Sequence, residues 1–157
     1  MTSESTLSEL FDRLAVTDTL YRYASSVDSR DLAGVRSVFA DDATFVADDA
    51  VVTGADAIVG MVDQYLGRLS WSHHLVNVYH MDINGDEASA LTYHTSHQIA
   101  TDTPDTVLEA IARYRDSLRR IEGVWRITRK EFQVGWVEER TTAQAPARAK
   151  FLGTAPQ

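Results

Sequence analysis

The sequence predicts an α+β domain, with three N-terminal helices packed on one face of a curved, mostly antiparallel sheet. In most of the first 66 residues, apolar side chains recur every three or four positions, which is the spacing of helices that bury one face. From residue 72 onward the spacing changes to every second position, which is typical of half-buried strands. We therefore expect a cone-shaped sheet whose open mouth is closed by the first helix.

The first helix is predicted over residues 7–27. Its apolar residues fall at i, i+4, i+7, i+8 and i+11, which is one face of a 3.6-residue period. This buried stripe consists of Val16, Leu20, Tyr23, Ala24 and Val27. The first turns of the same helix are also apolar, with Leu7, Leu10, Phe11 and Leu14.

Two shorter helices and a small hairpin follow. The second helix is predicted over residues 31–39, and a turn at 41–43 leads into two short strands, 44–47 and 51–53. Asp48-Asp49 forms the hairpin turn between them. A third helix is predicted over residues 55–66. Its expected buried side consists of Ile58, Met61, Val62, Tyr65 and Leu66.

Four long strands complete the predicted fold, over residues 72–83, 87–100, 107–121 and 124–137. Asn84-Gly85-Asp86 and Glu122-Gly123 are strong hairpin signals, so these strands read as an antiparallel meander. We expect one domain over residues 1–140 and a C-terminal tail over 141–157. The tail is rich in Ala, Thr and Pro and is expected on the surface or on a neighbouring subunit.

Composition narrows the classes of partner. The 157 residues include 23 acidic and 15 basic side chains, a net charge of −8, which disfavours nucleic acid and anionic membranes. No apolar run is long enough to span a bilayer, and the polar N-terminus does not read as a signal peptide. The absence of cysteine excludes disulfides and thiolate sites. We expect a cytoplasmic protein without a metal or cofactor.

One acidic residue stands out where the first helix should stop. Asp28 lies four residues after Ala24, so it sits at the edge of the buried stripe and needs a partner. We expect that partner to be a histidine from the pair His73-His74 at the start of the first long strand. By alternation one of the two points into the cone and the other away, and the sequence leaves open which.

The histidine content of the next strand is also high. His97 shares a face with Tyr93 and Thr95, and His94 lies on the opposite face. A histidine on a strand is more often a packed or exposed residue than a catalytic one. No HExxH spacing with a third ligand indicates a metal site.

Several short segments, in a fixed order, resemble a known family. They are Arg22-Tyr23-Ala24 with Val27-Asp28, Phe39-Ala40-Asp41-Asp42-Ala43, Gly54-Ala55-Asp56-Ala57-Ile58, His73 with Asn77, Asn84-Gly85-Asp86-Glu87-Ala88, and Tyr114 with Gly123-Val124-Trp125-Arg126-Ile127. Up to about Glu139 the chain is similar to the SnoaL-like group of the NTF2-like superfamily. That group includes scytalone dehydratase, bile acid 7α-dehydratase and hexachlorocyclohexane dehydrochlorinase. The resemblance implies the cone-shaped NTF2-like fold but no single reaction, because one fold hosts many functions.

The resemblance also implies site residues. The dehydratase-type pair of acid and histidine falls on Asp28 and His73, with His74 as the alternative, and the tyrosine of bile acid dehydratases falls on Tyr23. The second histidine of scytalone dehydratase matches His97 after a one-residue gap. The expected substrate contacts include Asn77, and Lys130 near the position of an arginine in the dehydrochlorinase.

These residue types suit removal of a proton from carbon. Imidazole is a base of the right strength at neutral pH, and a carboxylate on its far nitrogen fixes the tautomer. A phenol such as Tyr23 can donate to a developing enolate or a departing hydroxyl, and His97 can protonate the leaving group. The expected wall of the cavity is apolar, which implies a small, largely apolar cyclic or polyketide-like substrate. It consists of Phe45, Met61, Val62, Tyr65 and Trp71.

The leading hypothesis is therefore a cofactor-independent lyase or isomerase of the dehydratase or cyclase type, assembled as a homodimer or homotrimer. The alternative is a non-catalytic small-molecule-binding or accessory protein of the same fold. In that case the acid and the histidine only satisfy each other.

Overall fold

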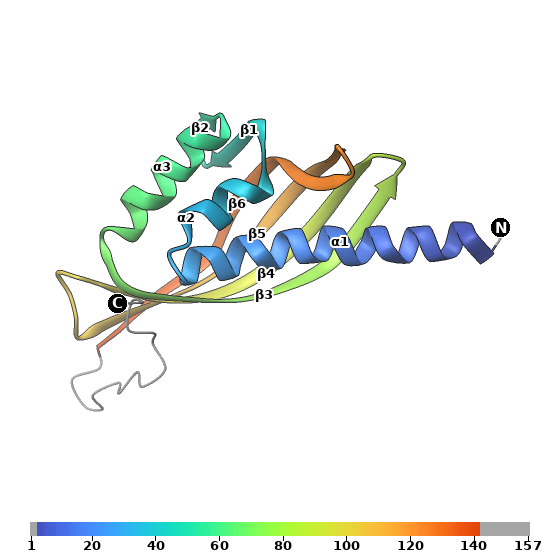
Figure 1. Ribbon diagram of the computed structural model, residues 1–157. Helices are drawn as coiled ribbons and strands as arrows, with labels where there is room; N and C mark the ends of the chain where they lie inside the picture. Colours follow the sequence, from blue (N-terminus) through green and yellow to red (C-terminus); the bar gives the residue numbers. More distant parts are fainter. Residues whose placement is uncertain (1–2, 142–157) are drawn as a thin grey trace.

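Three helices and six strands make up residues 3–141, the part of the chain that the computed structural model describes (Figure 1). The helices all precede the long strands, so the predicted α+β class is confirmed. The elements in chain order are α1 (Ser3–Asp28), α2 (Leu32–Val38), β1 (Phe39–Ala47), β2 (Ala50–Thr53), α3 (Ala55–Leu66), β3 (Leu69–Asn84), β4 (Glu87–Ala100), β5 (Thr106–Ile121) and β6 (Val124–Thr141).

The strands form one mixed sheet in the order β2-β1-β6-β5-β4-β3. Strands β3 to β6 form the expected antiparallel meander. Strand β1 runs parallel to β6, with Phe45 opposite Lys130, so the short hairpin of β1 and β2 extends the same sheet. The sequence did not reveal this parallel pairing, because about half of the chain separates β1 from β6.

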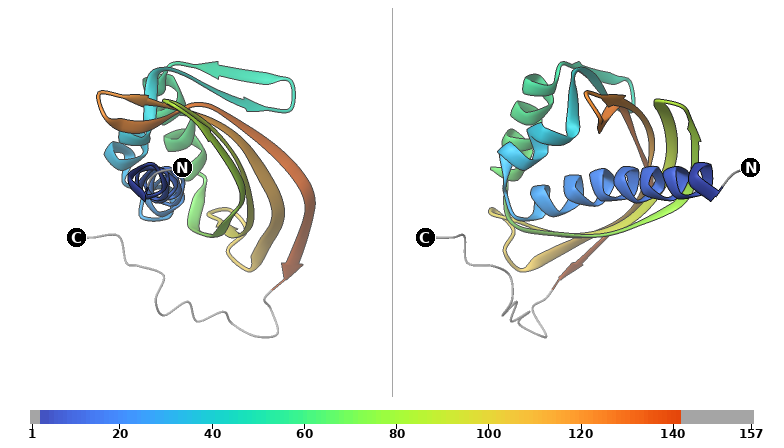
Figure 2. Two further views of the ribbon diagram at one scale, coloured as in Figure 1. Left: turned by 90° about the vertical axis from the view of Figure 1, so that its right-hand side faces the viewer. Right: turned by 45° about the vertical axis from the view of Figure 1, so that its right-hand side comes forward.

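The helices lie on the concave side of the curved sheet (Figure 2). The stripe predicted on α1 faces the sheet, and all five of its members are buried. Phe39, Ile58 and Ile127 are fully buried and join the second helix, the third helix and the sheet in one core. Burial of this apolar surface is the main force that holds helices and sheet together.

The first turns of helix α1 run beyond the end of the sheet (Figure 1). The apolar side chains of its N-terminal part are exposed: Leu7 by 51%, Leu10 by 53%, Phe11 by 68% and Leu14 by 67%. At Asp12 and Arg13 the helix already contacts the sheet, because Asp12 accepts hydrogen bonds from Arg120 and Trp125 and Arg13 donates to Met81. Phe11 and Leu14 are therefore exposed because they face away from the sheet.

Further along, α1 lies beside β3, the last strand of the sheet. The Arg13 guanidinium donates to the backbone carbonyl of Met81 at 3.2 Å. Just after the helix, Arg30 donates to the carbonyls of Leu66 and Leu69. These contacts fix the C-terminal end of α1, and with it Asp28, against the start of β3.

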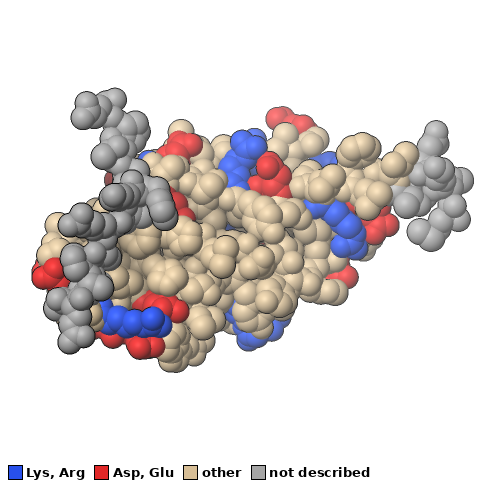
Figure 3. Space-filling view, turned by 90° about the horizontal axis from the view of Figure 1, so that it is seen from below, with Lys and Arg blue, Asp and Glu red and all other residues tan. Residues whose placement is uncertain are grey.

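Charged side chains are scattered over the face seen in Figure 3, where basic groups lie next to acidic ones and the middle is largely uncharged. Within residues 3–141, no helix is both long and apolar enough to cross a membrane. Of the expected tail over 141–157, Thr141 ends β6 and the remaining residues lie outside the described part of the chain.

Candidate functional site

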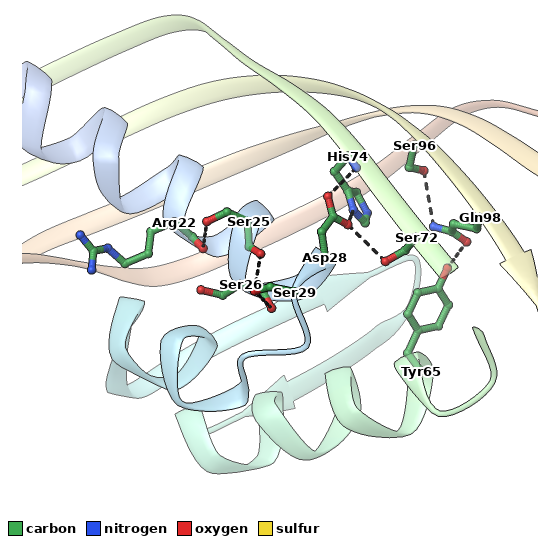
Figure 4. Close-up of polar contacts among 10 residues, drawn as sticks. All are labelled: Arg22, Ser25, Ser26, Asp28, Ser29, Tyr65, Ser72, His74, Ser96 and Gln98. Carbon is green, nitrogen blue, oxygen red and sulfur yellow. Dashed lines mark hydrogen bonds and ion pairs between the residues drawn. The ribbon is translucent and has the colours of Figure 1, made fainter. Parts of the chain in front are cut away.

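The C-terminal residue of α1 and a histidine of β3 form a close pair (Figure 4). The His74 ring nitrogen Nδ1 lies 2.6 Å from Asp28 Oδ1, and the His74 backbone N–H donates to Asp28 Oδ2 at 2.7 Å. The Ser72 hydroxyl also donates to Asp28 Oδ1, at 3.2 Å. One carboxylate thus holds both the ring and the backbone of the same histidine.

These contacts lower the pKa of Asp28 and fix the tautomer of His74. Burial raises the pKa of the Asp28 carboxyl, but the hydrogen bonds and charge of His74 and the hydrogen bond of Ser72 outweigh it, and the net pKa is lowered. An ionised carboxylate only accepts hydrogen bonds, so the neutral His74 ring carries its proton on Nδ1. Its other nitrogen, Nε2, keeps a free lone pair. The side chain of His74 is 10% exposed and lines a cavity.

The predicted contact of Asp28 with His73 is wrong by one residue. His73 lies on the outer, convex face of the sheet and is exposed, and its ring stacks between those of Trp71 and His97. His97 is the cross-strand partner of His73, so it shares that outer face. The error has one physical cause, because a shift of one position in a strand exchanges its two faces.

His94, and not His97, is the second histidine on the inner wall. It is 4% exposed, and its ring meets that of His74 edge to face, with centroids 5.5 Å apart. Desolvation, followed by the charges of His74 and Lys130, lowers the pKa of His94 to about 4. Within residues 3–141 no group forms a hydrogen bond with its buried Nδ1. The ring is therefore neutral at physiological pH.

Hydrophobic alternation offered no signal for His94. The outer face of β4 carries Leu91 and Tyr93, whereas the inner face is built from small or polar side chains. These inner residues are Ala88, Ala90, Thr92, His94, Ser96 and Gln98. A polar inner wall is what a binding cavity needs, but a pattern of apolar residues cannot reveal it.

The two histidines open into a cavity of about 370 Å³ between the concave face of the sheet and helices α1 and α3. Of the residues expected on its wall, Phe45, Met61, Val62 and Tyr65 line it. Tyr23 lines it as well, 8% exposed, and desolvation raises the pKa of its phenol, which is therefore neutral. The remaining wall is mostly apolar: Val27, Leu108, Ala110, Tyr114, Phe132, Val134 and Val137.

Trp71, an expected wall residue, and Asn77, an expected substrate contact, both lie outside the cavity. Trp71 stacks on His73, and Asn77 is the exposed cross-strand partner of Tyr93, so both belong to the outer face with His73. Their expected positions followed from the same one-residue error. Neither lines the cavity.

Lys130 is buried beneath the cavity rather than on its wall. Its ammonium lies 2.7 Å from Asp116 Oδ1, and it sits over the rings of Tyr114 and Tyr23, 3.9 and 4.6 Å from their centroids. Burial lowers the pKa of Lys130 and raises that of Asp116, while their attraction opposes both shifts. Lys130 and His74 both line a separate chamber of about 20 Å³, the size of one water molecule.

A row of three polar side chains, Tyr65, Gln98 and Ser96, lies along the cavity wall beside His74 (Figure 4). The Tyr65 hydroxyl donates to Gln98 Oε1, and Gln98 Nε2 donates to Ser96 Oγ at 3.5 Å. Ser96 and Gln98 are 1% and 8% exposed, so both polar groups are buried in the wall. Ser96 and Gln98 could not be recognised from the sequence, since neither residue type marks a site by itself.

Within residues 3–141, no group of three or more His, Asp or Glu side chains is placed to hold a metal ion. The chemistry that the arrangement offers is acid–base chemistry. It consists of an imidazole held by a carboxylate, a second neutral imidazole, a phenol and an apolar cavity. Such a set can remove a proton from a small substrate and return it.

Comparison with known proteins shows the family and the fold of the chain. The SnoaL-like domain family matches residues 8–131. A type 2 hexachlorocyclohexane dehydrochlorinase has a similar structure, with a TM-score of 0.80 and 16% identity over 87% of this chain and 93% of the other. No curated protein sequence is similar enough to count as a relative.

Two structures from Novosphingobium aromaticivorans are also similar. One carries the provisional name of a scytalone dehydratase, with a TM-score of 0.78 and 18% identity over 85% of this chain and 90% of the other. The second carries the provisional name of an aromatic ring hydroxylase, with a TM-score of 0.75 and 26% identity over 83% and 94%. The three structures share one fold but are named for different reactions.

Proposed function

We propose that this chain, which belongs to the SnoaL-like domain family, is a lyase- or isomerase-type enzyme in which His74 removes a proton from carbon. The observation that carries the proposal is the contact between Asp28 and His74 Nδ1, which leaves Nε2 free at the wall of an apolar cavity. A solvated or purely structural pair would not need its histidine to line a cavity of ligand size.

The carboxylate gives the imidazole its function in two ways. It fixes the tautomer, so the basic lone pair is on Nε2, and it stabilises the imidazolium that forms when the proton is taken. The backbone N–H of His74 also holds the Asp28 carboxylate, so the group that the ring contacts is fixed in place. No cofactor is needed, because imidazole is a competent base at neutral pH.

The same residues can complete an elimination. After His74 has taken the proton, the leaving group departs from the neighbouring carbon, and the imidazolium can supply the proton that turns a departing hydroxide into water. The neutral phenol of Tyr23 can donate a hydrogen bond to the departing oxygen. In an isomerisation the proton returns to a different carbon. His94 packs against His74 and limits the positions that the His74 ring can take.

Size and lining of the cavity support a small substrate. A volume of about 370 Å³ with a mostly apolar wall suits one alicyclic or aromatic ring system. The names of two similar structures, a dehydrochlorinase and a scytalone dehydratase, support the lyase class at this coarse level. The neighbours differ too much in sequence and in name to support one substrate.

The test is proton exchange in D2O. The protein is incubated with small cyclic ketones, β-hydroxy ketones and halogenated cyclohexanes, and deuterium uptake or loss of water or halide is measured. His74→Ala should lower the rate by roughly 10²- to 10⁴-fold, which is the usual effect of removing a general base. His73→Ala is the matched control, because it removes the neighbouring ring from the outer face. Equal rates for His74→Ala and wild type would overturn the proposal.

A non-catalytic binding protein makes the opposite forecast. Members of the panel would then raise the melting temperature, while no proton would exchange in any of them. His74→Ala would change affinity alone. Tight binding without exchange across the whole panel would therefore favour the binding-protein alternative.

A further inference from the structure

The polar row on the cavity wall runs in one direction. The phenol of Tyr65 donates a hydrogen bond to Gln98 Oε1, and Gln98 Nε2 donates a hydrogen bond to Ser96 Oγ. Tyr65 and Gln98 thus each donate a hydrogen bond to the next residue of the row. The hydroxyl proton of Ser96 is the last donor, and within residues 3–141 no acceptor receives it.

Ser96 also lies directly opposite the base on the neighbouring strand. His74 of β3 and Ser96 of β4 are direct cross-strand partners. The backbone N–H of His74 points away from β4, because it donates to Asp28. The two residues therefore form a non-hydrogen-bonded pair, the type in which the side chains of an antiparallel ladder come closest. Both line the same cavity.

A base and a hydrogen-bond donor side by side match one kind of substrate. In a ketone, the carbonyl oxygen and the hydrogen on the adjacent carbon are separated by only two intervening carbons. When His74 Nε2 takes that hydrogen, the C–H electron pair forms a carbon–carbon double bond and the carbonyl π pair moves onto oxygen. The negative charge therefore appears on the oxygen, where a preorganised donor has its largest effect.

We propose that the Ser96 hydroxyl, oriented by Gln98 and Tyr65, binds the carbonyl oxygen of the substrate and stabilises its enolate. The substrate class is then a cyclic ketone, and not a halogenated alkane, because a carbon–halogen bond offers only a weak acceptor to an O–H donor. This inference rests on the proposed function of His74 as the base. Ser96 contacts the substrate, whereas Gln98 and Tyr65 are positioning residues.

Burial makes an unpaired donor on Ser96 unfavourable. Ser96 and Gln98 are almost fully removed from solvent, so a hydroxyl proton without an acceptor is destabilising, and a bound carbonyl oxygen would relieve this cost. In this low-dielectric setting each bond of the row also polarises the next, so Tyr65 and Gln98 make Ser96 a better donor. The partly exposed ring of Tyr65 lies on α3, so the row links the mouth of the cavity to the base.

The first experiment compares variants with 2-tetralone as the enolisable ketone. Ser96→Ala should slow deuterium exchange by roughly 10²- to 10³-fold, the usual effect of losing one oxyanion donor. Gln98→Glu is nearly isosteric but accepts from Ser96 instead of donating to it, so it should turn the hydroxyl away from the cavity and slow exchange similarly. Thr95→Ala, which removes a hydroxyl from the outer face of the same strand, is the control and should leave the rate unchanged.

The outcomes separate the two proposals. If Ser96→Ala exchanges as fast as wild type while His74→Ala does not exchange, the assignment of Ser96 is overturned and the base stands. If His74→Ala also retains full exchange, the proposed function itself fails. A halogenated cyclohexane that loses halide in a His74-dependent reaction, with 2-tetralone inert, would overturn the ketone class.

A binding measurement does not depend on turnover. 2-Naphtholate has the shape and charge of the 2-tetralone enolate, and its absorbance reports its ionisation. Wild type should lower the pKa of bound 2-naphthol, and Ser96→Ala should lose most of that effect while its melting temperature stays close to that of wild type. Equal ionisation of 2-naphthol on both proteins would overturn the proposal.

Discussion

His74 and His94 meet edge to face on the inner wall of the sheet, with ring centroids 5.5 Å apart and an interplanar angle of 78°. Their environments differ sharply. A carboxylate holds His74 through Nδ1, whereas His94 is desolvated and has no partner on Nδ1 within residues 3–141. Desolvation lowers the pKa of His94 to about 4, and the effect of this shift on stability can be measured.

The first prediction concerns stability in acid. The pKa of His94 is about 4 in the folded protein and about 6.5 in the unfolded chain, so the unfolded chain binds the proton first. The contribution of His94 to stability is therefore complete above pH 6.5 and is lost as the pH falls from 6.5 towards 4. His94→Gln should flatten the fall in melting temperature over this window. His80→Gln, an exposed histidine, is the control, and equal slopes for His94→Gln and wild type would contradict the prediction.

The second prediction separates two roles of Asp28. In Asp28→Asn the amide oxygen can still accept the backbone N–H of His74, but the amide nitrogen must then donate to the ring, which moves the ring proton to Nε2. Exchange activity should fall by roughly 10²- to 10⁴-fold, because the base loses its lone pair on the cavity side. The melting temperature should fall less than in Asp28→Ala, which leaves buried donors unpaired at a cost of about 1–3 kcal/mol. Equal melting temperatures for all three proteins would mean that the acid is solvated.

The third prediction concerns the buried pair of Lys130 and Asp116. Lys130→Met leaves the Asp116 carboxylate without its cation and should cost about 3–5 kcal/mol in the free energy of unfolding. Adding Asp116→Asn removes the uncompensated charge and should recover much of that loss. Urea denaturation of the two single variants and the double variant gives the coupling energy. A double variant as unstable as the sum of the singles would show that the two groups do not interact.

The fourth prediction concerns the outer face. His73→Ala and His97→Ala remove two stacked rings that lie away from the cavity, so proton exchange should remain within about twofold of wild type. Each should change the free energy of unfolding by roughly 0.5 kcal/mol or less, as is usual for surface positions. A large loss of exchange in either variant, with unchanged stability, would assign the chemistry to the outer face instead.

The sequence predicted the helices well because their apolar spacing is long and regular. The bounds of α3 were predicted to the residue, since Gly54 and Gly67 flank a pattern with a clear buried side. The parallel partner of β1 was not predicted, because no local pattern encodes which distant strand a short strand joins. Strand spacing also specified that His73 and His74 face opposite sides.

No local feature of the sequence indicated which of the two histidines faces the cavity. The Asp28 side chain contacts β3 from the concave side of the sheet. The packing of α1 against β3 therefore decides that His74, and not His73, points inward. Near the other end of the strand, an irregularity between Val78 and His80 changes the alternation, and Met81 becomes the buried residue. Counting alternate positions back from the hairpin at Gly85 therefore yields the wrong face for the histidines.

The contact of Asp28 with the backbone of His74 also occupies a hydrogen-bonding group on the open edge of the sheet. Strand β3 ends the sheet, so one side of its backbone has no strand partner. Asp28 takes up the N–H of His74 on that side, while Arg13 and Arg30 take up the carbonyls of Met81 and Leu69. An extended peptide or a second copy of the chain therefore finds no free ladder along these positions, and strand addition at this edge would require α1 to leave first.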